Sequence, residues 1–212
     1  MFRQITGPEH RRKMNKDRQA RLILFTRYPE PGRTKTRLIP ALGAQGAATL
    51  QRQMSEAIVA QMAAFAAQYP VSLEIRYADG NQQAMEAWLA SDIPCLDQGE
   101  GDLGDRLHLA FAQAFAQGAR AVVVIGADCP GLAPALFAQA FVALTRNDLV
   151  LGPAMDGGYY LIGLKHPAPA LFSQIPWGKG EVLAATLKQA QGLNLSTHLL
   201  EPLADVDRPE DL

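Results

Sequence analysis

Apolar residues recur at two spacings along this chain, and each spacing predicts a different element. Short runs rich in β-branched residues, or alternating with polar ones, predict β-strands. Residues spaced three or four apart predict helices, as Leu50, Met54, Ile58 and Met62 do in the longest stretch. The predicted strands are 21–27, 71–78, 93–96, 121–125, 148–152, 159–164 and 194–201, and the predicted helices are about 44–68, 80–91, the latter part of 97–118, 134–145 and 181–191.

Strands and helices therefore alternate through the first three quarters of the chain. Such alternation predicts an α/β fold with a mainly parallel sheet covered by helices on both faces. We expect one domain over residues 20–212. Residues 1–19 mix basic and polar side chains without a periodic apolar face, so we expect them to form a flexible basic N-terminal tail.

Composition narrows the classes of partner. The chain has 20 basic and 21 acidic residues and no long apolar run. We therefore expect no nucleic-acid partner and no membrane partner. Two cysteines, Cys95 and Cys129, are too few for a disulfide framework, which favours a reducing, cytoplasmic setting. The four histidines show no metal-binding spacing, and no serine lies in a nucleophile motif.

An acidic residue ends the most apolar predicted strand. In AVVVIGADCPG (121–131), Asp128 follows the strand directly, where open α/β sheets bind their ligands. Asp156 lies in a glycine-rich turn between two later strands, and Asp205 and Asp207 follow the last one. Carboxylates at these positions predict a site with three acidic corners for a hard cation, Mg²⁺ or Mn²⁺. Cys129 is a weaker candidate nucleophile, because no histidine partner is evident.

The loop after the first strand carries three cations. In PGRTKTRL, Arg33, Lys35 and Arg37 occupy alternate positions, which suits binding to phosphates. The segment is neither a Walker A loop nor a dinucleotide-binding fingerprint, since both consensus patterns are missing. A solvated basic loop is the alternative.

A second glycine-rich loop, GEGDLGDRL (99–107), leads into a predicted helix. Glycines let a backbone approach a ligand, and a helix N-terminus offers unpaired N–H groups. We therefore expect Gly101, Asp102, Gly104 and Arg106 to contact a nucleotide. The alternative is that Asp102 or Asp105 simply caps the helix.

Four segments together carry a family resemblance: KTRLIPAL (35–42), GADCPGL (126–132), GPAMDGGYYLIGL (152–164) and ADVDRPEDL (204–212). In order and spacing they resemble an uncharacterised GT-A-type glycosyltransferase-like family (DUF2064-like), related to 2-phospholactate guanylyltransferase and molybdenum-cofactor guanylyltransferase. The resemblance covers about residues 20–212. It implies a Rossmann-like GT-A fold, that of the nucleotide-diphospho-sugar transferases, with Asp128, Asp205 and Asp207 on Mg²⁺ and the PGRTKTR loop on the phosphates.

Two positions depart from that pattern. Arg208 replaces a threonine common in the final motif, and Lys179 lies where small hydroxyl residues are usual. Both changes concern the small-molecule acceptor, whose identity stays open. A homo-oligomer is also possible, and the sequence does not decide whether one forms.

Two reactions suit such a site. In glycosyl transfer from an NDP-sugar, which we favour, Asp156 is the candidate general base and Lys35 a catalytic cation. In nucleotidyl transfer, an acceptor phosphate attacks an NTP and pyrophosphate leaves, so no general base is needed. A third hypothesis is a nucleotide-binding module without catalysis.

Overall fold

The computed structural model describes residues 19–212, so the predicted N-terminal tail lies outside the described residues except for Gln19. Its elements are β1 (Ala20–Arg27), η1 (Thr36–Leu38), α2 (Ile39–Ala66), β2 (Val71–Ala78), α3 (Gln82–Leu89), β3 (Cys95–Asp97), α4 (Leu103–Ala116), β4 (Ala121–Gly126), α5 (Pro134–Ala143), β5 (Leu149–Pro153), β6 (Tyr159–Leu164), η2 (Pro169–Phe172), α6 (Val182–Gly192), β7 (Thr197–Leu199) and η3 (Pro209–Asp211). Every predicted strand and helix is present, although several boundaries differ.

The largest boundary differences occur at α2 and β7. Helix α2 begins at Ile39 rather than near residue 44, and the backbone of Gly43 leaves the helical region at φ 70°. The sequence pattern misses the first turns because their apolar residues do not continue the later stripe. Strand β7 is only the central part of the predicted run 194–201, since its ladder with β5 spans three residue pairs.

Seven strands form one sheet in the order β3-β2-β1-β4-β6-β5-β7. Strand β6 runs antiparallel to β4 and β5, and the other neighbouring pairs are parallel. The predicted mainly parallel sheet is therefore confirmed. The reversal of β6 follows from the short turn after β5, because a parallel connection needs a crossover of a dozen residues or more.

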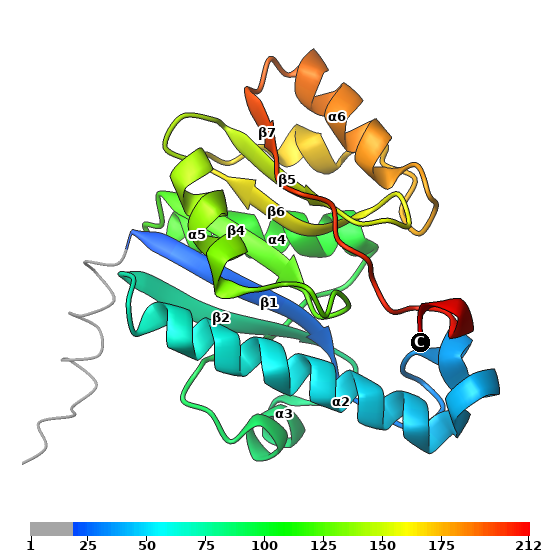
Figure 1. Ribbon diagram of the computed structural model, residues 1–212. Helices are drawn as coiled ribbons and strands as arrows, with labels where there is room; N and C mark the ends of the chain where they lie inside the picture. Colours follow the sequence, from blue (N-terminus) through cyan, green and yellow to red (C-terminus); the bar gives the residue numbers. More distant parts are fainter. Residues whose placement is uncertain (1–18) are drawn as a thin grey trace, which may run out of the picture.

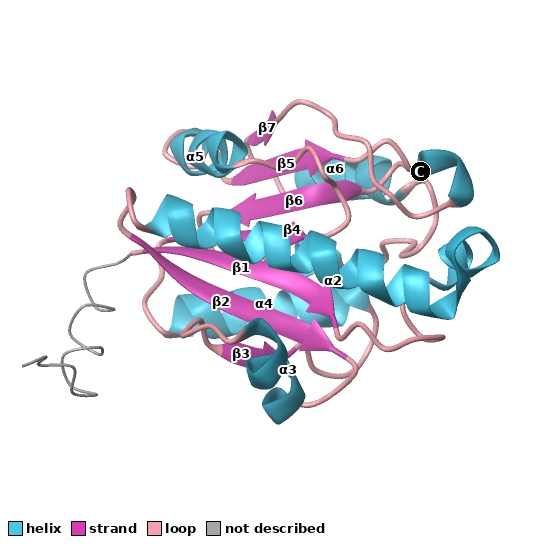
Figure 2. Ribbon diagram, turned by 60° about the horizontal axis from the view of Figure 1, so that its bottom comes forward, coloured by secondary structure: helices cyan, strands magenta, loops and turns pink. Residues whose placement is uncertain are grey.

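Helices cover both faces of the sheet (Figures 1 and 2). Helices α2, α3 and α5 lie on one face, and α4 and α6 lie on the other. Alternate residues of β1 enter the two cores: Leu22 and Leu24 pack under α2, whereas Ile23 and Phe25 pack under α4. This two-sided burial explains why the central residues 22–25 of β1 and 122–125 of β4 are all apolar.

Strand β2 departs from that rule. Its polar residues face α4, where Glu74 and Arg76 are buried and form an ion pair at 2.6 Å. Arg76 also donates to Gln113 of α4 at 2.6 Å, and Arg21 donates to Glu74 at 3.1 Å. Burial is tolerated here because each charge has a hydrogen-bonded partner.

No described helix, within residues 19–212, has the length and apolarity to span a membrane.

Candidate active site

Two adjoining cavities open at the carboxyl ends of β1 and β4, where the strand order changes direction. The first has a volume of about 640 Å³ and the second about 510 Å³. Six residues line both cavities: Arg37, Leu103, Gly126, Asp128, Tyr159 and Asp207. Ligands of open α/β sheets bind at such a position, so the cavities form one candidate site with two lobes.

The cationic loop lines the second cavity. Residues 33–37 all face it. The loop folds back because Thr34 Oγ1 donates to the Tyr28 carbonyl at 2.8 Å and the Thr34 amide donates to the Glu30 carbonyl at 3.2 Å. Arg33 is exposed and pairs with Glu30 at 3.3 Å. The predicted phosphate-binding loop therefore lies at the site.

Lys35 has the most constrained position in this loop. Its backbone is left-handed, at φ 45° and ψ 48°, which costs a residue with a Cβ about 1–2 kcal/mol. Its side chain is only 4% exposed. The ammonium donates to Asp128 Oδ1 at 2.8 Å and to the Val206 carbonyl at 2.7 Å. Lys35 thus joins three segments that are distant in sequence.

The C-terminal segment runs beside the loop that follows β4. The Val206 amide donates to the Asp128 carbonyl at 2.9 Å, and the Met155 amide donates to the Leu203 carbonyl at 3.0 Å. Asp207 pairs with Arg37, and both residues line both cavities. The hydrogen bond and the charge of Asp207 raise the pKa of Arg37. These contacts bring the predicted metal ligands of the tail to the carboxyl end of β4.

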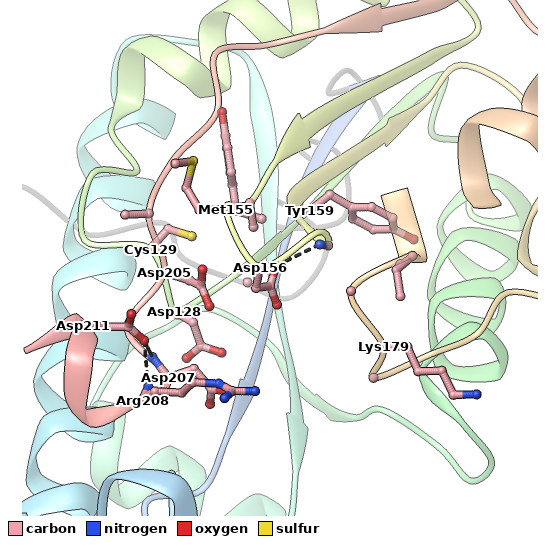
Figure 3. A pocket seen from close by; sticks show the side chains of 18 of the residues that line it. Asp128, Cys129, Met155, Asp156, Tyr159, Lys179, Asp205, Asp207, Arg208 and Asp211 are labelled. Atoms are coloured by element: carbon pink, nitrogen blue, oxygen red, sulfur yellow. Dashed lines mark hydrogen bonds between the residues drawn. The ribbon is translucent and has the colours of Figure 1, made fainter. Parts of the chain in front are cut away.

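Asp128, Asp205 and Asp207 all line the first cavity, but they do not share one coordination sphere as they stand. Within residues 19–212, no three carboxylate, imidazole or thiol side chains lie close enough together to hold a metal ion. Figure 3 shows Asp128, Asp156 and Asp205 around the same opening. Carboxylate oxygens suit a hard cation, so the chemistry of this donor set fits Mg²⁺ or Mn²⁺.

Burial distinguishes Asp205 from Asp128. The Asp128 side chain is 55% exposed. Asp205 is partly buried, and burial, followed by the nearby charge of Asp156, raises the pKa of its carboxyl group. A cation bound among these groups would relieve that repulsion.

Asp156 occupies the turn between β5 and β6. Its carboxylate accepts a hydrogen bond from the Gly158 amide at 2.8 Å, and it lines the first cavity but not the second. The turn packs tightly on the loop before α6: a Cβ on Gly157 would lie 2.0 Å from the Gly180 carbonyl oxygen. Asp156 therefore stabilises this turn, and its exposed carboxylate also faces the first cavity.

The second glycine-rich loop lies largely outside the two cavities. Gly101, Asp102, Gly104 and Arg106 line neither cavity, whereas Leu103 lines both. Asp102 and Asp105 cap α4 reciprocally in a capping box, so the capping alternative holds for both. Gly104 lies against Trp177, where a Cβ would come within 2.6 Å of the indole nitrogen. Nucleotide contact by these four residues stays a prediction, and the roles that the structure shows are helix capping by Asp102 and packing of Gly104 on Trp177.

Cys129 is unsuited to nucleophilic attack in this structure. Its side chain is buried. Burial, followed by the charges of Asp205 and Asp128, raises the pKa of its thiol to about 12. A thiol with such a pKa is protonated near neutral pH, which agrees with a packing role.

A family model described as "Uncharacterized protein conserved in bacteria (DUF2064)" matches residues 58–179. The chain belongs to this DUF2064 family. The matched region includes Asp128 and Asp156 but neither the cationic loop nor the tail carboxylates. None of the curated proteins compared with the chain matches it.

Solved structures extend the comparison. A protein from Desulfovibrio desulfuricans G20, provisionally described as a nucleotide-diphospho-sugar transferase, is 34% identical with a TM-score of 0.82, over 90% of this chain and 83% of that one. The 4-diphosphocytidyl-2C-methyl-D-erythritol synthase of Anaerococcus prevotii DSM 20548 is 10% identical with a TM-score of 0.61, over 94% and 95% of the two chains. Glucosyl-3-phosphoglycerate synthase of Mycobacterium tuberculosis, solved with Mn²⁺ and UDP, is 13% identical with a TM-score of 0.56, over 100% and 80%. The last two share the fold, which confirms the predicted GT-A-type architecture for this DUF2064 protein.

Sequence patterns missed several cavity residues of the DUF2064 chain. Gln51 and Gln98 are buried and line the second cavity. Gln98 Nε2 donates to the Thr26 and Arg76 carbonyls at 3.0 and 3.1 Å. Its place after β3 was a usable signal, because ligands bind at the carboxyl ends of strands. Gln51 lies inside a long helix, and nothing in the spacing of its neighbours marks it.

Proposed function

We propose that this protein is a metal-dependent transferase that moves a sugar from an NDP-sugar to a small-molecule hydroxyl acceptor. One observation carries the proposal. Asp128 and Asp207 line both lobes of the site, the cationic loop residues Arg33 and Lys35 line only the second, and Asp156 lines only the first. Glycosyl transfer requires this order: first phosphate-binding cations, then metal-binding carboxylates, and then a carboxylate base.

The second cavity is the donor lobe in this proposal. Lys35 and Arg37 would hold the diphosphate of the donor, because a guanidinium and an ammonium are the usual protein partners of phosphate oxygens. Bound to Asp128 and the tail carboxylates, Mg²⁺ would neutralise negative charge on the leaving diphosphate. The fold supports this arrangement through two relatives, one solved with UDP and Mn²⁺ and one provisionally described as a nucleotide-diphospho-sugar transferase.

The first cavity is the acceptor lobe. Six carboxylates line it, against three cations, and one of those cations, Arg37, is already paired with Asp207. The six are Asp128, Asp156, Asp205, Asp207, Glu210 and Asp211. Such a wall disfavours a phosphorylated acceptor and suits one with neutral hydroxyl groups, which carboxylates can orient by accepting hydrogen bonds. Trp177 adds an aromatic surface to the same lobe.

The proposed reaction needs one proton acceptor. The acceptor hydroxyl oxygen forms a bond to the anomeric carbon while the bond from that carbon to the diphosphate oxygen breaks. The bonding electron pair leaves on the diphosphate, which Lys35 and Arg37 stabilise. The hydroxyl proton passes to a carboxylate oxygen of Asp156, the group placed in the acceptor lobe.

Nucleotidyl transfer is the second candidate, and the three cations of one loop favour it. Arg33, Lys35 and Arg37 line the same cavity and would suit a triphosphate. An acceptor phosphate would then attack the α-phosphorus of an NTP, with loss of pyrophosphate and no role for a base.

Product release distinguishes the candidates. The protein is incubated with each common NDP-sugar and each NTP, with Mg²⁺ or Mn²⁺ and with either a mixture of neutral polyols and sugars or a mixture of phosphorylated small molecules. Release of NDP from one NDP-sugar supports glycosyl transfer, and release of pyrophosphate from one NTP in the presence of phosphorylated acceptors supports nucleotidyl transfer. If the protein binds a nucleotide saturably and in a metal-dependent way but forms neither product with any acceptor, the third hypothesis, a nucleotide-binding module without catalysis, is supported.

A further inference from the structure

The two cations that would bind donor phosphates already hold two of the three carboxylates that would bind the metal. Lys35 donates to Asp128 at 2.8 Å, and Arg37 pairs with Asp207. The ammonium of Lys35 also reaches the Val206 carbonyl at 2.7 Å, so it ties the end of β4 to the tail. Each carboxylate therefore has a cation as its partner before any metal arrives.

We infer that Lys35 and Arg37 act as place-holders for the metal: each pairs with a metal-binding carboxylate until donor phosphates bind and draw it away. Metal and nucleotide therefore bind with strong mutual dependence. The inference rests on the proposed function, since it assumes that Asp128 and Asp207 are metal ligands and that the loop binds phosphate.

Electrostatics explains why a place-holder is needed. Asp128, Asp156, Asp205 and Asp207 all line one cavity, so four carboxylates lie around the same opening. Without a cation, these carboxylates would repel one another and push the tail away from β4. Lys35 and Arg37 supply the missing charge from the neighbouring loop.

The same contacts oppose binding of a metal by itself. The Lys35 side chain is only 4% exposed, so an ammonium displaced from Asp128 would lose its anionic partner in a poorly solvated position. A diphosphate in the second cavity provides a new partner, because Lys35 and Arg37 both line that cavity. Phosphates therefore draw the cations off the carboxylates, and the carboxylates become available to the metal.

The left-handed backbone of Lys35 supports the same conclusion. Its φ of 45° and ψ of 48° are unfavourable for a residue with a Cβ. The side-chain contacts with Asp128 and Val206 help to hold the loop in this conformation, beside the hydrogen bond from the Leu38 amide to the Lys35 carbonyl. Replacing those contacts by phosphate contacts allows the loop to move. Linkage then requires that the metal strengthens phosphate binding by the same factor as phosphate strengthens metal binding.

The test measures Mn²⁺ binding directly, by the electron paramagnetic resonance signal of free Mn²⁺. Wild-type protein, Lys35→Met, Arg37→Met and the control Lys188→Met are titrated with Mn²⁺ alone, then with pyrophosphate present at fixed free Mn²⁺. Lys188 is an exposed lysine of α6, so its variant removes the same charge away from the site. Arg37→Met provides an exposed position in case Lys35→Met affects folding.

We expect wild-type protein and Lys188→Met to bind Mn²⁺ weakly by itself and about tenfold or more tightly with pyrophosphate, a usual size for coupling between sites. Lys35→Met and Arg37→Met should bind Mn²⁺ alone several-fold more tightly than wild type and gain less from pyrophosphate. Equal or weaker Mn²⁺ binding by both variants, beside coupled binding by wild type, would overturn the place-holder inference and leave the proposed function intact. No Mn²⁺ binding by wild type under either condition would overturn both.

Discussion

The amide of Val206 donates to the carbonyl of Asp128 at 2.9 Å, although the numbers of the two residues differ by 78. This hydrogen bond places the tail against the loop after β4 and brings Asp205 and Asp207 to the cavity that Asp128 lines. The candidate site therefore depends on a main-chain contact as much as on the acidic side chains.

Val206→Pro removes that donor and should separate the tail from Asp128. We expect a stability loss of about 1 kcal/mol, the usual net value of one such hydrogen bond, and a much larger relative loss of metal-dependent nucleotide binding. Val206→Ala keeps the amide and is the matched control. Urea denaturation and calorimetric titration with nucleotide and Mn²⁺ measure the two effects, and equal nucleotide affinity in both variants would argue against a role for the tail.

Asp156→Asn keeps the size of the side chain and its acceptor for the Gly158 amide, but it cannot accept the hydroxyl proton. We expect roughly a 10²–10⁴-fold fall in glycosyl transfer, the usual contribution of a positioned general base, with nearly unchanged donor binding. Asp92→Asn, at an exposed position after α3, is the control. Turnover within twofold of wild type would remove Asp156 from the mechanism and favour nucleotidyl transfer.

Gly157→Ala should disturb the turn that presents Asp156. The new Cβ would lie 2.0 Å from the Gly180 carbonyl oxygen, and the φ of Gly157 is +87°. Overpacking and backbone strain together should cost about 2–5 kcal/mol. Gly178→Ala has a similar φ, +77°, but meets nothing within 4 Å, so its cost should be only about 1–2 kcal/mol. Thermal melting of the two variants tests the difference, and similar melting temperatures would mean that the turn moves freely from Gly180.

Ser196→Ala should reduce stability in a pH-dependent way. The Ser196 hydroxyl, and then its amide, donate to Asp148 and lower the pKa of that carboxyl below its ordinary value of 3.8. A carboxyl group with a lowered folded-state pKa stabilises the fold above its unfolded pKa, and the contribution disappears as pH falls through the folded value. Wild type should therefore exceed Ser196→Ala in stability at pH 7, and the gap should shrink below about pH 4. Denaturation across pH 3–7 measures it, with the exposed Ser173→Ala as control. A gap that stays constant with pH would contradict the assignment to Asp148.

Local pattern was enough to predict the fold of this protein and the positions of two parts of its candidate site. The apolar, β-branched run 121–125 predicted a buried strand, and the position of Asp128 shortly after it predicted a ligand-binding carboxylate at the carboxyl end of the sheet. The three cations after the first strand likewise indicated a phosphate-binding loop, and the structure places that loop beside Asp128. Both signals lie within a few residues of one strand end, so they need no knowledge of distant contacts.

Local pattern failed where the environment comes from another part of the chain. The alternation in 71–78 predicts a strand, but only the packing of α4 shows that Glu74 and Arg76 are buried as an ion pair. The sequence likewise does not show that Trp177 packs on Gly104 at the start of α4, and nucleotide contact by that glycine-rich loop stays a prediction. In each case the residue that makes the contact comes from another part of the folded chain, so the neighbours in sequence do not reveal it.

The sequence by itself determined the α/β architecture, the strand ends and the residue types at the site, because strand and helix periodicity is set by neighbours along the chain. Only the tertiary structure decided that Lys35 binds Asp128, that Arg37 pairs with Asp207 and that the three candidate metal ligands remain apart. Charges attract any opposite charge within reach, so their pairing depends on which loops the folded sheet brings together, and spacing along the chain does not specify that choice.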